Sequence, residues 1–188
     1  MSAPIRVEGF EAMFAREADP WGTWERRDEA VKRGAILRAC GHIRGRALEL
    51  ACGNGSNTAA LRSKALRLLA VDGAPSAVSI TQKRVTGPRV SVAQAVLPDE
   101  TPRDVFDLIV IAEVLYYLRG REIVRLGARL RLAPGGRLVL AHHHIRFHDV
   151  SSDPAAVHAT LLAALPQPLA RVFHRQTGRW RVEGFAPR

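Results

Sequence analysis

A glycine-rich turn between two apolar runs carries the residue types that can hold a nucleoside. Glu49 precedes Cys52, the turn Gly53-Asn54-Gly55 follows, and Asp72 ends the next apolar run, 19 residues after Gly53. Glycine adopts unusual dihedral angles and lets a ligand approach the backbone with no Cβ in the way. An acid at the end of the next strand can accept hydrogen bonds from the two hydroxyls of a ribose. The spacing therefore predicts a nucleoside cofactor bound where the two strands end.

Three cofactors compete for this turn, and a purely structural role, in which the glycines only join a strand to a helix, is the alternative. A dinucleotide site requires a third glycine, but the turn continues with Ser56 and Asn57. A P-loop requires a Gly-Lys-Ser or Gly-Lys-Thr ending, which the sequence lacks. S-adenosylmethionine has no phosphate, and its sulfonium and amino-acid parts need a close turn preceded by an acid, here Glu49. The turn therefore favours S-adenosylmethionine, with S-adenosylhomocysteine as the product.

Residues after the fourth apolar run can serve methyl transfer. Transfer from a sulfonium is an in-line displacement, so the protein mainly positions the nucleophile and excludes water. Glu113 can hydrogen-bond the substrate or take its proton, or it can simply start a helix, where the dipole favours an acid. Tyr116 and Tyr117 can wall the methyl pocket or can pack as ordinary aromatic residues.

A row of histidines, His142-His143-His144, follows the fifth apolar run. We predict His142 as a base near pH 7 or a substrate contact, with His143 open to the same two roles and a structural or solvent-facing role as the alternative for both. A metal site, which would add His148, is a weaker interpretation because adjacent residues of a strand point to opposite faces of the sheet. We therefore predict no metal ion.

Short apolar runs alternate with helical segments from Arg46 onward, which predicts a parallel sheet with helices on both faces. The run from Phe106 to Ala112 is apolar almost throughout, as is typical of a strand buried on both faces. The expected strands are residues 47–51, 66–71, 89–94, 106–112 and 137–141, the expected helices between them are residues 58–64, 76–84 (capped by Ser76) and 121–132, and a turn covers 134–136.

The two ends of the chain follow other patterns. We expect residues 1–42 to form a helical lid, broken at Asp19-Pro20-Trp21-Gly22, with Thr23 as the N-cap of its second helix. Trp21 then folds over the cofactor or, alternatively, belongs to the core. Residues 153–165 predict a helix, and residues 169–174 and 179–185 a hairpin. We predict one domain over residues 1–188, with an α/β, Rossmann-like, doubly wound, mostly parallel seven-stranded sheet and an antiparallel C-terminal hairpin.

Taken together, these motifs resemble the class I S-adenosylmethionine-dependent methyltransferases, and among them the nodulation protein S family of small N-methyltransferases. The resemblance rests on Asp19-Pro20-Trp21, Glu49–Gly55, Val71-Asp72, FDLIVIAEVLYYL at 106–118 and LAPGG at 132–136. It implies N-methylation of a free amine on a glycan (a lipo-chitooligosaccharide in that family) or on a small molecule. With the residues above, the expected catalytic residues are Glu113, Tyr116 and His142, and the expected cofactor contacts are Trp21, Glu49, Gly53, Asn54, Gly55, Asp72, Gly73, Ala95, Val96 and Glu113.

The chain departs from the family pattern in three places. The segment between Trp21 and Glu29 is shorter than in the family, and the histidine row is unexpected there. Gln94-Ala95-Val96 offers no acid for the adenine amine, so a backbone carbonyl or Asp99 would have to serve. These departures motivate one alternative function, a non-catalytic nucleoside-binding module.

The net charge of +10 motivates another alternative, a methyltransferase that acts on RNA or DNA. The charge is spread along the chain, however, and Ala112-Glu113-Val114-Leu115 occupies the place of the Pro-Pro-aromatic motif used in base amino-methylation. Cys52 belongs to the glycine turn and is not placed as a nucleophile for cytosine. A nucleic-acid partner is therefore less favoured than a small molecule or an oligosaccharide.

Cysteine usage and hydropathy bear on the compartment. The 188 residues include two cysteines with no CxxC spacing, which favours a reducing cytoplasm. No apolar run reaches the roughly 18 residues of a membrane span, and the N-terminus lacks a signal-peptide pattern. We therefore expect a soluble cytoplasmic protein with no membrane span.

Overall fold

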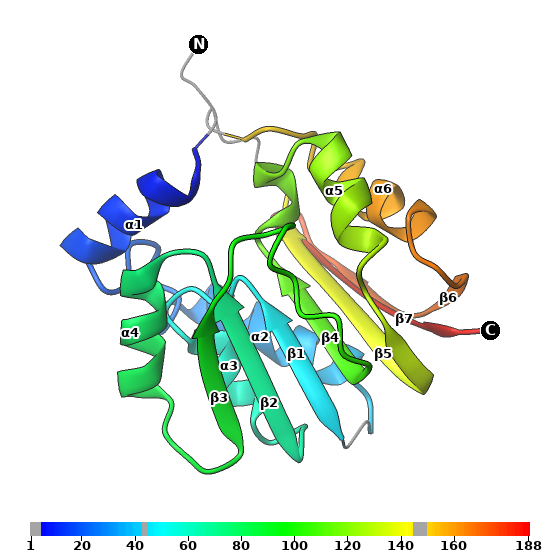
Figure 1. The fold of residues 1–188 in the computed structure, drawn as a ribbon, viewed down its shortest axis with the longest axis horizontal. Coiled ribbons are helices and arrows are strands. Elements are labelled where there is room, and N and C mark those ends of the chain that lie inside the picture. Colours follow the sequence, from blue (N-terminus) through cyan, green and yellow to red (C-terminus); the bar gives the residue numbers. More distant parts are fainter. Residues whose placement is uncertain (1–4, 43–44, 145–149) are drawn as a thin grey trace.

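The computed structural model describes residues 5–42, 45–144 and 150–188. In this part of the chain seven strands form one sheet in the order β3-β2-β1-β4-β5-β7-β6 (Figure 1). The strands are β1 (Arg46–Leu50), β2 (Arg67–Asp72), β3 (Val90–Gln94), β4 (Phe106–Ala112), β5 (Leu132–His143), β6 (Leu169–Gln176) and β7 (Trp180–Pro187). The helices are α1 (Val7–Arg16), α2 (Arg27–Ala39), α3 (Ser56–Leu61), α4 (Pro75–Arg84), the short 3₁₀ helix η1 (Leu115–Tyr117), α5 (Gly120–Gly127) and α6 (Val157–Ala163).

Strand order places a ligand site between β1 and β4. The first five strands pair in parallel, β7 pairs antiparallel with β5, and β6 pairs antiparallel with β7. The predicted fold, a mostly parallel sheet with an antiparallel C-terminal hairpin, is confirmed. The chain builds the sheet outward from β1 in one direction through β2 and β3, and in the other through β4 and β5. In sheets of this kind ligands bind outside the carboxyl ends of the strands where the order reverses.

Both faces of the sheet are covered, because successive residues of a strand point to opposite faces. On one face Leu48 and Ile109 pack in a cluster with residues of α5 and α6. On the other, Ala47 and Val110 pack in a cluster with residues of α2 and α3. Figure 1 shows α2 and α3 behind the sheet, and α1 beside α4 at the edge where the parallel strands end. The apolar run of β4 is buried on both faces, as its sequence predicts.

Two residues predicted as N-caps, Thr23 and Ser76, make other hydrogen bonds in the structure. The second helix begins at Arg27 and not at Thr23, because the amide and hydroxyl of Thr23 both donate to the Asp19 carboxylate. Helix α4 begins one residue before Ser76, whose hydroxyl donates to Glu11 Oε1 at 2.6 Å. The Thr23 hydroxyl thus closes a local turn, while the Ser76 hydroxyl connects α4 to α1.

The boundary between α5 and β5 also differs from the prediction. The helix expected to reach Leu132 ends at Gly127, since Leu132 already pairs with Phe106 as the first residue of β5. The expected turn at residues 134–136 lies inside the bounds of β5, where the pairing with β4 shifts register. Among the described residues, no helix is long and apolar enough to cross a bilayer.

Candidate functional site

A cavity of about 600 Å³ opens at the carboxyl ends of the central parallel strands. This volume lies within the range of small-molecule sites, about 300–1,000 Å³. Its lining comes from α1, α2 and the segments that follow β1, β2, β3 and β4, and includes Phe10, Phe14, Trp21, Glu29, Lys32, Cys52, Gly53, Asn54, Asp72, Gly73, Val96, Glu113, Tyr116, Tyr117 and His143. The cavity therefore joins the predicted cofactor turn to the residues after β4 and β5.

The glycine turn is held by the acid at the end of β2. Gly53 and Gly55 have positive φ values, 55° and 82°, which favour glycine. A Cβ on Gly55 would lie 2.9 Å from two side-chain atoms of Thr81, so the turn packs too closely for a larger residue. The Gly53 N–H donates to Asp72 Oδ2 at 2.8 Å. The turn and the predicted ribose-binding acid are thus one unit.

Asp72 is buried at the cavity wall, with 9% of its surface exposed. Its Oδ1 accepts the Ala74 N–H at 2.9 Å. Burial raises the pKa of this carboxyl above its ordinary value even though backbone N–H groups donate to it. A pair of hydroxyl donors at the cavity wall would stabilise the ionised carboxylate, which is the chemistry that a ribose provides.

Three of the expected cofactor contacts lie behind the lining. Glu49 alternates along β1 with Leu48 and Leu50, so its side chain points toward α3, where Thr58 Oγ1 donates to it at 2.6 Å. Burial raises the pKa of Glu49 to about 8, so this acid is largely protonated at neutral pH. Gly55 and Ala95 are buried and also do not line the cavity. The structure therefore places these three residues in support of the turn and the sheet.

The remaining expected contacts reach the cavity, and the Asp19 turn connects the α1 segment to them. Asp19 Oδ1 accepts the Asn54 side-chain amide at 2.7 Å, and Asp19 Oδ2 accepts the Trp24 N–H at 3.0 Å. Trp21 is 39% exposed and its ring meets Phe14 edge-on, with centroids 5.4 Å apart. Trp21 is therefore a rim residue beside α1 and not part of the core.

Four charged or titratable side chains meet on the other side of the cavity, and we call Glu29, Lys32, Glu113 and His143 the acceptor-side cluster. Lys32 is 3% exposed, and its Nζ lies 2.6 Å from Glu113 Oε1 and 2.9 Å from Glu29 Oε2. His143 Nδ1 lies 2.8 Å from Glu113 Oε1, and His143 Nε2 lies 3.2 Å from Glu29 Oε1. The two carboxylates raise the pKa of His143 to about 9 despite its burial, so the ring is cationic at neutral pH.

Sequence reasoning singled out Glu113 but not its partners on α2. Lys32 and Glu29 lie 81 and 84 positions before Glu113, and nothing local in the sequence connects them. The one available signal was the i, i+3 spacing of Glu29 and Lys32, which places both on one side of a helix. Glu113 itself has a φ of 58°, a strained value for a non-glycine residue, so tertiary contacts hold it in place.

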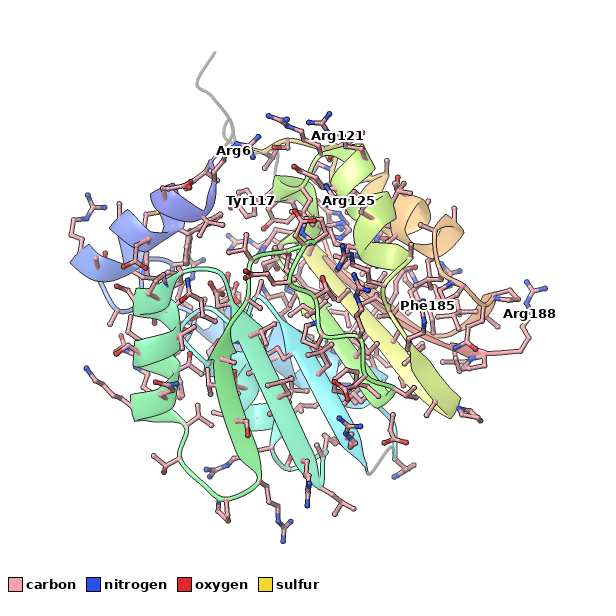
Figure 2. All side chains as sticks on the ribbon, in the orientation of Figure 1. Arg6, Tyr117, Arg121, Arg125, Phe185 and Arg188 are labelled. Atoms are coloured by element: carbon pink, nitrogen blue, oxygen red, sulfur yellow. The ribbon has the colours of Figure 1, made fainter. Side chains whose placement is uncertain are left out.

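The tyrosines of η1 flank this cluster. The Tyr116 hydroxyl donates to Glu113 Oε2 at 2.7 Å, and burial raises the pKa of Tyr116 further above its ordinary value. The Tyr117 ring meets Phe10 of α1 edge-on, with centroids 4.9 Å apart. Figure 2 shows Tyr117 between α1 and α5. Both rings line the cavity, as one of the two sequence interpretations expected.

The structure corrects the position of His142. Strand β5 continues through the first two histidines, so His142 and His143 point to opposite faces, and His143 is the one that reaches the cavity. His142 is 1% exposed, and its Nδ1 lies 2.8 Å from His158 Nε2. His158 Nδ1 lies in turn 2.7 Å from Glu183 Oε2. The residue expected to act as a base is thus part of a buried hydrogen-bonded series, His142–His158–Glu183, on the face of the sheet that α5 and α6 cover.

The burial of His142 in this series makes the free energy of unfolding depend on pH in the acid range. Burial and the neighbouring His158 lower the pKa of His142 from 6.5 to about 3, so the unfolded chain binds a proton near pH 6.5 while the folded protein stays neutral. The free energy of unfolding should therefore fall as pH drops below 6.5, by about 2 kcal/mol between pH 7 and pH 5 from His142 alone. Urea unfolding at both pH values measures this loss.

A His142→Asn variant should lose about 2 kcal/mol less than the wild type over that interval, because its side chain cannot titrate. Comparing the two proteins cancels the opposite contribution of His143, whose pKa is raised. His174→Asn, which replaces an exposed histidine, serves as the matched control for the substitution itself. An identical pH dependence in wild type and His142→Asn would refute the assignment.

The described histidines of the row, His142 to His144, belong to no group arranged to hold a metal ion. Over residues 5–42, 45–144 and 150–188, no group of three or more histidine, cysteine, aspartate or glutamate side chains is arranged to hold a metal ion. His148, the fourth histidine of that interpretation, lies outside the described residues.

Comparison with known proteins gives a consistent family match. Residues 12–139 match the model of the Nodulation protein S (NodS) family. A Nodulation protein S from Rhizobium tropici is 37% identical over 150 residues, covering 72% of this chain and 63% of that relative. One from Sinorhizobium fredii is 32% identical over 128 residues, covering 64% of this chain and 59% of the relative. The chain thus spans about three fifths of the length of these curated relatives.

Solved structures extend the likeness over the whole chain. The N-methyltransferase NodS from Bradyrhizobium japonicum WM9, crystallised with S-adenosyl-L-homocysteine, superposes with a TM-score of 0.77. It is 26% identical, and the match covers 96% of this chain and 97% of that one. A DhpI complex with S-adenosylhomocysteine has a TM-score of 0.75 at 22% identity, covering 96% and 94%, which shows a shared fold.

Proposed function

The chain belongs to the nodulation protein S family, and from this premise we propose that it is an S-adenosylmethionine-dependent methyltransferase that methylates an amine. The acceptor that we propose is the free amine of an oligosaccharide, such as a lipo-chitooligosaccharide, or of a small molecule. The observation that carries the proposal is the single cavity in which the Gly53–Asp72 unit and the acceptor-side cluster both take part.

The first half of this cavity fits a nucleoside cofactor. Asp72 offers carboxylate oxygens for a ribose, the Gly53 turn gives close backbone approach, and Val96 lines the wall beyond β3. Asp99, the other candidate for the adenine amine, pairs with Arg125 instead. The crystallised relative from Bradyrhizobium japonicum holds S-adenosyl-L-homocysteine, which supports the same ligand class here.

When bound, S-adenosylmethionine supplies a methyl group already activated on a sulfonium. The chain then has to exclude water and to orient the acceptor. Phe10 and Phe14 of α1 lie over the cavity, and Trp21 closes its rim. Asp19 ties this cover to the glycine turn through Asn54. The cover and the turn are thereby positioned together around the reacting groups.

A methyl-transfer assay tests the proposal. The purified chain is incubated with S-adenosylmethionine and either a chitooligosaccharide bearing one free terminal amine, its fully N-acetylated counterpart, or a panel of small amines. Release of S-adenosylhomocysteine is expected with free amines and not with the acetylated sugar. Binding of S-adenosylhomocysteine without transfer to any amine would indicate a nucleoside-binding module, and transfer to RNA or DNA alone would indicate a nucleic-acid methyltransferase.

A further inference from the structure

We propose that Glu29, on α2, is the residue that receives the acceptor amine, and that Glu113 is the fixed centre around which the acceptor-side cluster is built. This inference rests on the proposed function and names the group that would recognise its substrate. It assigns a substrate contact to a helix that otherwise packs against the sheet, and it moves that contact away from the acid that the sequence favoured.

Glu113 has no acceptor position left for a substrate N–H group. Lys32 Nζ and His143 Nδ1 approach Oε1 at 2.6 and 2.8 Å. The Tyr116 hydroxyl and the His143 backbone N–H donate to Oε2 at 2.7 and 3.1 Å. A carboxylate offers about four acceptor positions, two on each oxygen. A substrate N–H could therefore reach Glu113 only by displacing one of the protein's own donors.

Glu29 keeps a hydrogen-bond acceptor position at the cavity surface. Its Oε1 faces Lys32 Nζ at 3.1 Å and His143 Nε2 at 3.2 Å, while its Oε2 faces Lys32 Nζ at 2.9 Å. These contacts leave an acceptor position on Oε2. The Glu29 side chain is 12% exposed and lines the cavity. The carboxylate is thus shielded from most solvent, and an acceptor amine in the cavity can still reach it.

The other two members of the cluster cannot receive an N–H group. Lys32 is a cation with no acceptor atom. Both ring nitrogens of His143 face carboxylate oxygens, and its raised pKa keeps both of them protonated. Glu29 is therefore the member of these four side chains that can take a hydrogen bond from an amine without rearrangement.

Charge balance favours an amine that is neutral when it reacts. The charges of two carboxylates, Lys32 and protonated His143 sum to zero, so the acceptor-side cluster does not hold a third cation strongly. In the transfer step the nitrogen lone pair forms the bond to the methyl carbon, and the carbon–sulfur bond breaks with its electron pair left on sulfur. The nitrogen then carries the positive charge that the sulfonium has lost, and the product is an ammonium. His143 and Lys32 hold the pKa of Glu29 below its ordinary value despite its burial, so the Glu29 carboxylate stays ionised and can accept a charge-assisted hydrogen bond from this nitrogen.

Glu29→Gln tests the inference, with Glu25→Gln as a matched control at an exposed position outside the cavity lining. Loss of a hydrogen bond to a charged group predicts a fall in kcat/KM for a free-amine chitooligosaccharide of about 10- to 100-fold. Affinity for S-adenosylhomocysteine, measured by calorimetry, should stay within about 2-fold of wild type, since Glu29 does not belong to the Gly53–Asp72 unit. Glu25→Gln should match wild type in both measurements.

A second measurement needs no turnover. With S-adenosylhomocysteine present, the wild type should bind the free-amine chitooligosaccharide more tightly than the N-acetylated one, and Glu29→Gln should lose that preference. Unchanged preference and unchanged kcat/KM in Glu29→Gln would overturn the inference, as would an equal loss of S-adenosylhomocysteine affinity, which indicates a structural role. Wild-type transfer to no amine would instead reject the proposed function, and the binding comparison would still decide the role of Glu29.

Discussion

Replacing Asp72 with asparagine should weaken binding of S-adenosylhomocysteine by at least about 100-fold, because the site loses charge-assisted hydrogen bonds to the ribose, each contributing about 1.5–3 kcal/mol. The carboxylate also organises the glycine turn, since its Oδ2 accepts the Gly53 N–H at 2.8 Å. An asparagine amide nitrogen at Oδ2 would face that N–H as a second donor. At Oδ1 it would face the Ala74 N–H in the same way. Either orientation of the amide thus disturbs the turn or the segment after β2.

Isothermal titration with S-adenosylhomocysteine measures this effect, with Asp107→Asn as the control. Asp107 is an acid of β4, the strand on the other side of β1 from β2, and its Oδ2 accepts the Arg46 N–H at 2.7 Å, outside the cavity lining. The control removes one carboxylate of the same sheet and should leave affinity within about 2-fold of wild type. An Asp72→Asn protein that is folded and binds as tightly as the control would remove the basis for placing a nucleoside at this turn.

Local sequence patterns predicted the glycine turn and the acid beside it because these features are local. The FDLIVIA run of β4 is typical of a strand buried on both faces, and the structure places it as one. The glycine turn needs positive φ at Gly53 and Gly55, and few other residues adopt it. Asp72 ends β2 beside this turn because parallel strands finish at one edge of the sheet. Each of these features depends on backbone conformation and strand order, and not on contacts between distant side chains.

Side-chain direction was harder to predict, because a strand extended by two residues decides it. The expected strand ended at residue 141, which left the facing of His142 and His143 undefined. Strand β5 instead runs to His143, so the alternation continues through both rings and points His142 toward His158 of α6, away from the cavity. Glu49 follows the same rule on β1, where it points toward Thr58 and away from the cavity. A one-position shift in the alternation of a strand exchanges which of two successive residues points into the cavity.

Contacts between distant segments were beyond the reach of sequence patterns altogether. Asp19-Pro20-Trp21 was identified as a break between helices, but its hydrogen bond to Asn54 of the glycine turn joins two separate elements. Lys32 likewise received no role from the sequence patterns, yet it is 3% exposed between two acids. Such contacts depend on how the elements pack, which an alternation or a turn motif in one segment does not encode.

Glu113→Gln should lower both the stability and the turnover of the protein. The amide leaves Lys32 and His143 without the carboxylate that both approach, and its NH₂ group adds a donor where donors already converge. Breaking a buried ion pair costs about 3–5 kcal/mol, and since 26% of the Glu113 side chain is exposed we expect about 2–3 kcal/mol. That is a fall in Tm of about 4–12 °C for a chain of this size. Turnover should fall at least about 100-fold, since α2 and β5 lose their common anchor beside the acceptor.

Differential scanning calorimetry and the methyl-transfer assay measure the two effects, with Glu17→Gln as an exposed control that should change neither. A double variant, Glu113→Gln with Lys32→Met, separates the effect of the buried Lys32 charge on stability from the effect of Glu113 on turnover. In Glu113→Gln the buried Lys32 ammonium keeps Glu29 but has lost its shorter carboxylate contact; the double variant no longer buries that ammonium, so it should regain part of the lost stability while its turnover stays low. If Tm in Glu113→Gln stayed within about 1 °C of wild type, the Lys32 contact would be too weak to organise the site. Equal stability of the single and double variants would contradict the claim that the remaining Lys32 ammonium destabilises Glu113→Gln. Recovery of stability without recovery of turnover is the result that identifies the ion pair as the support of the acceptor side.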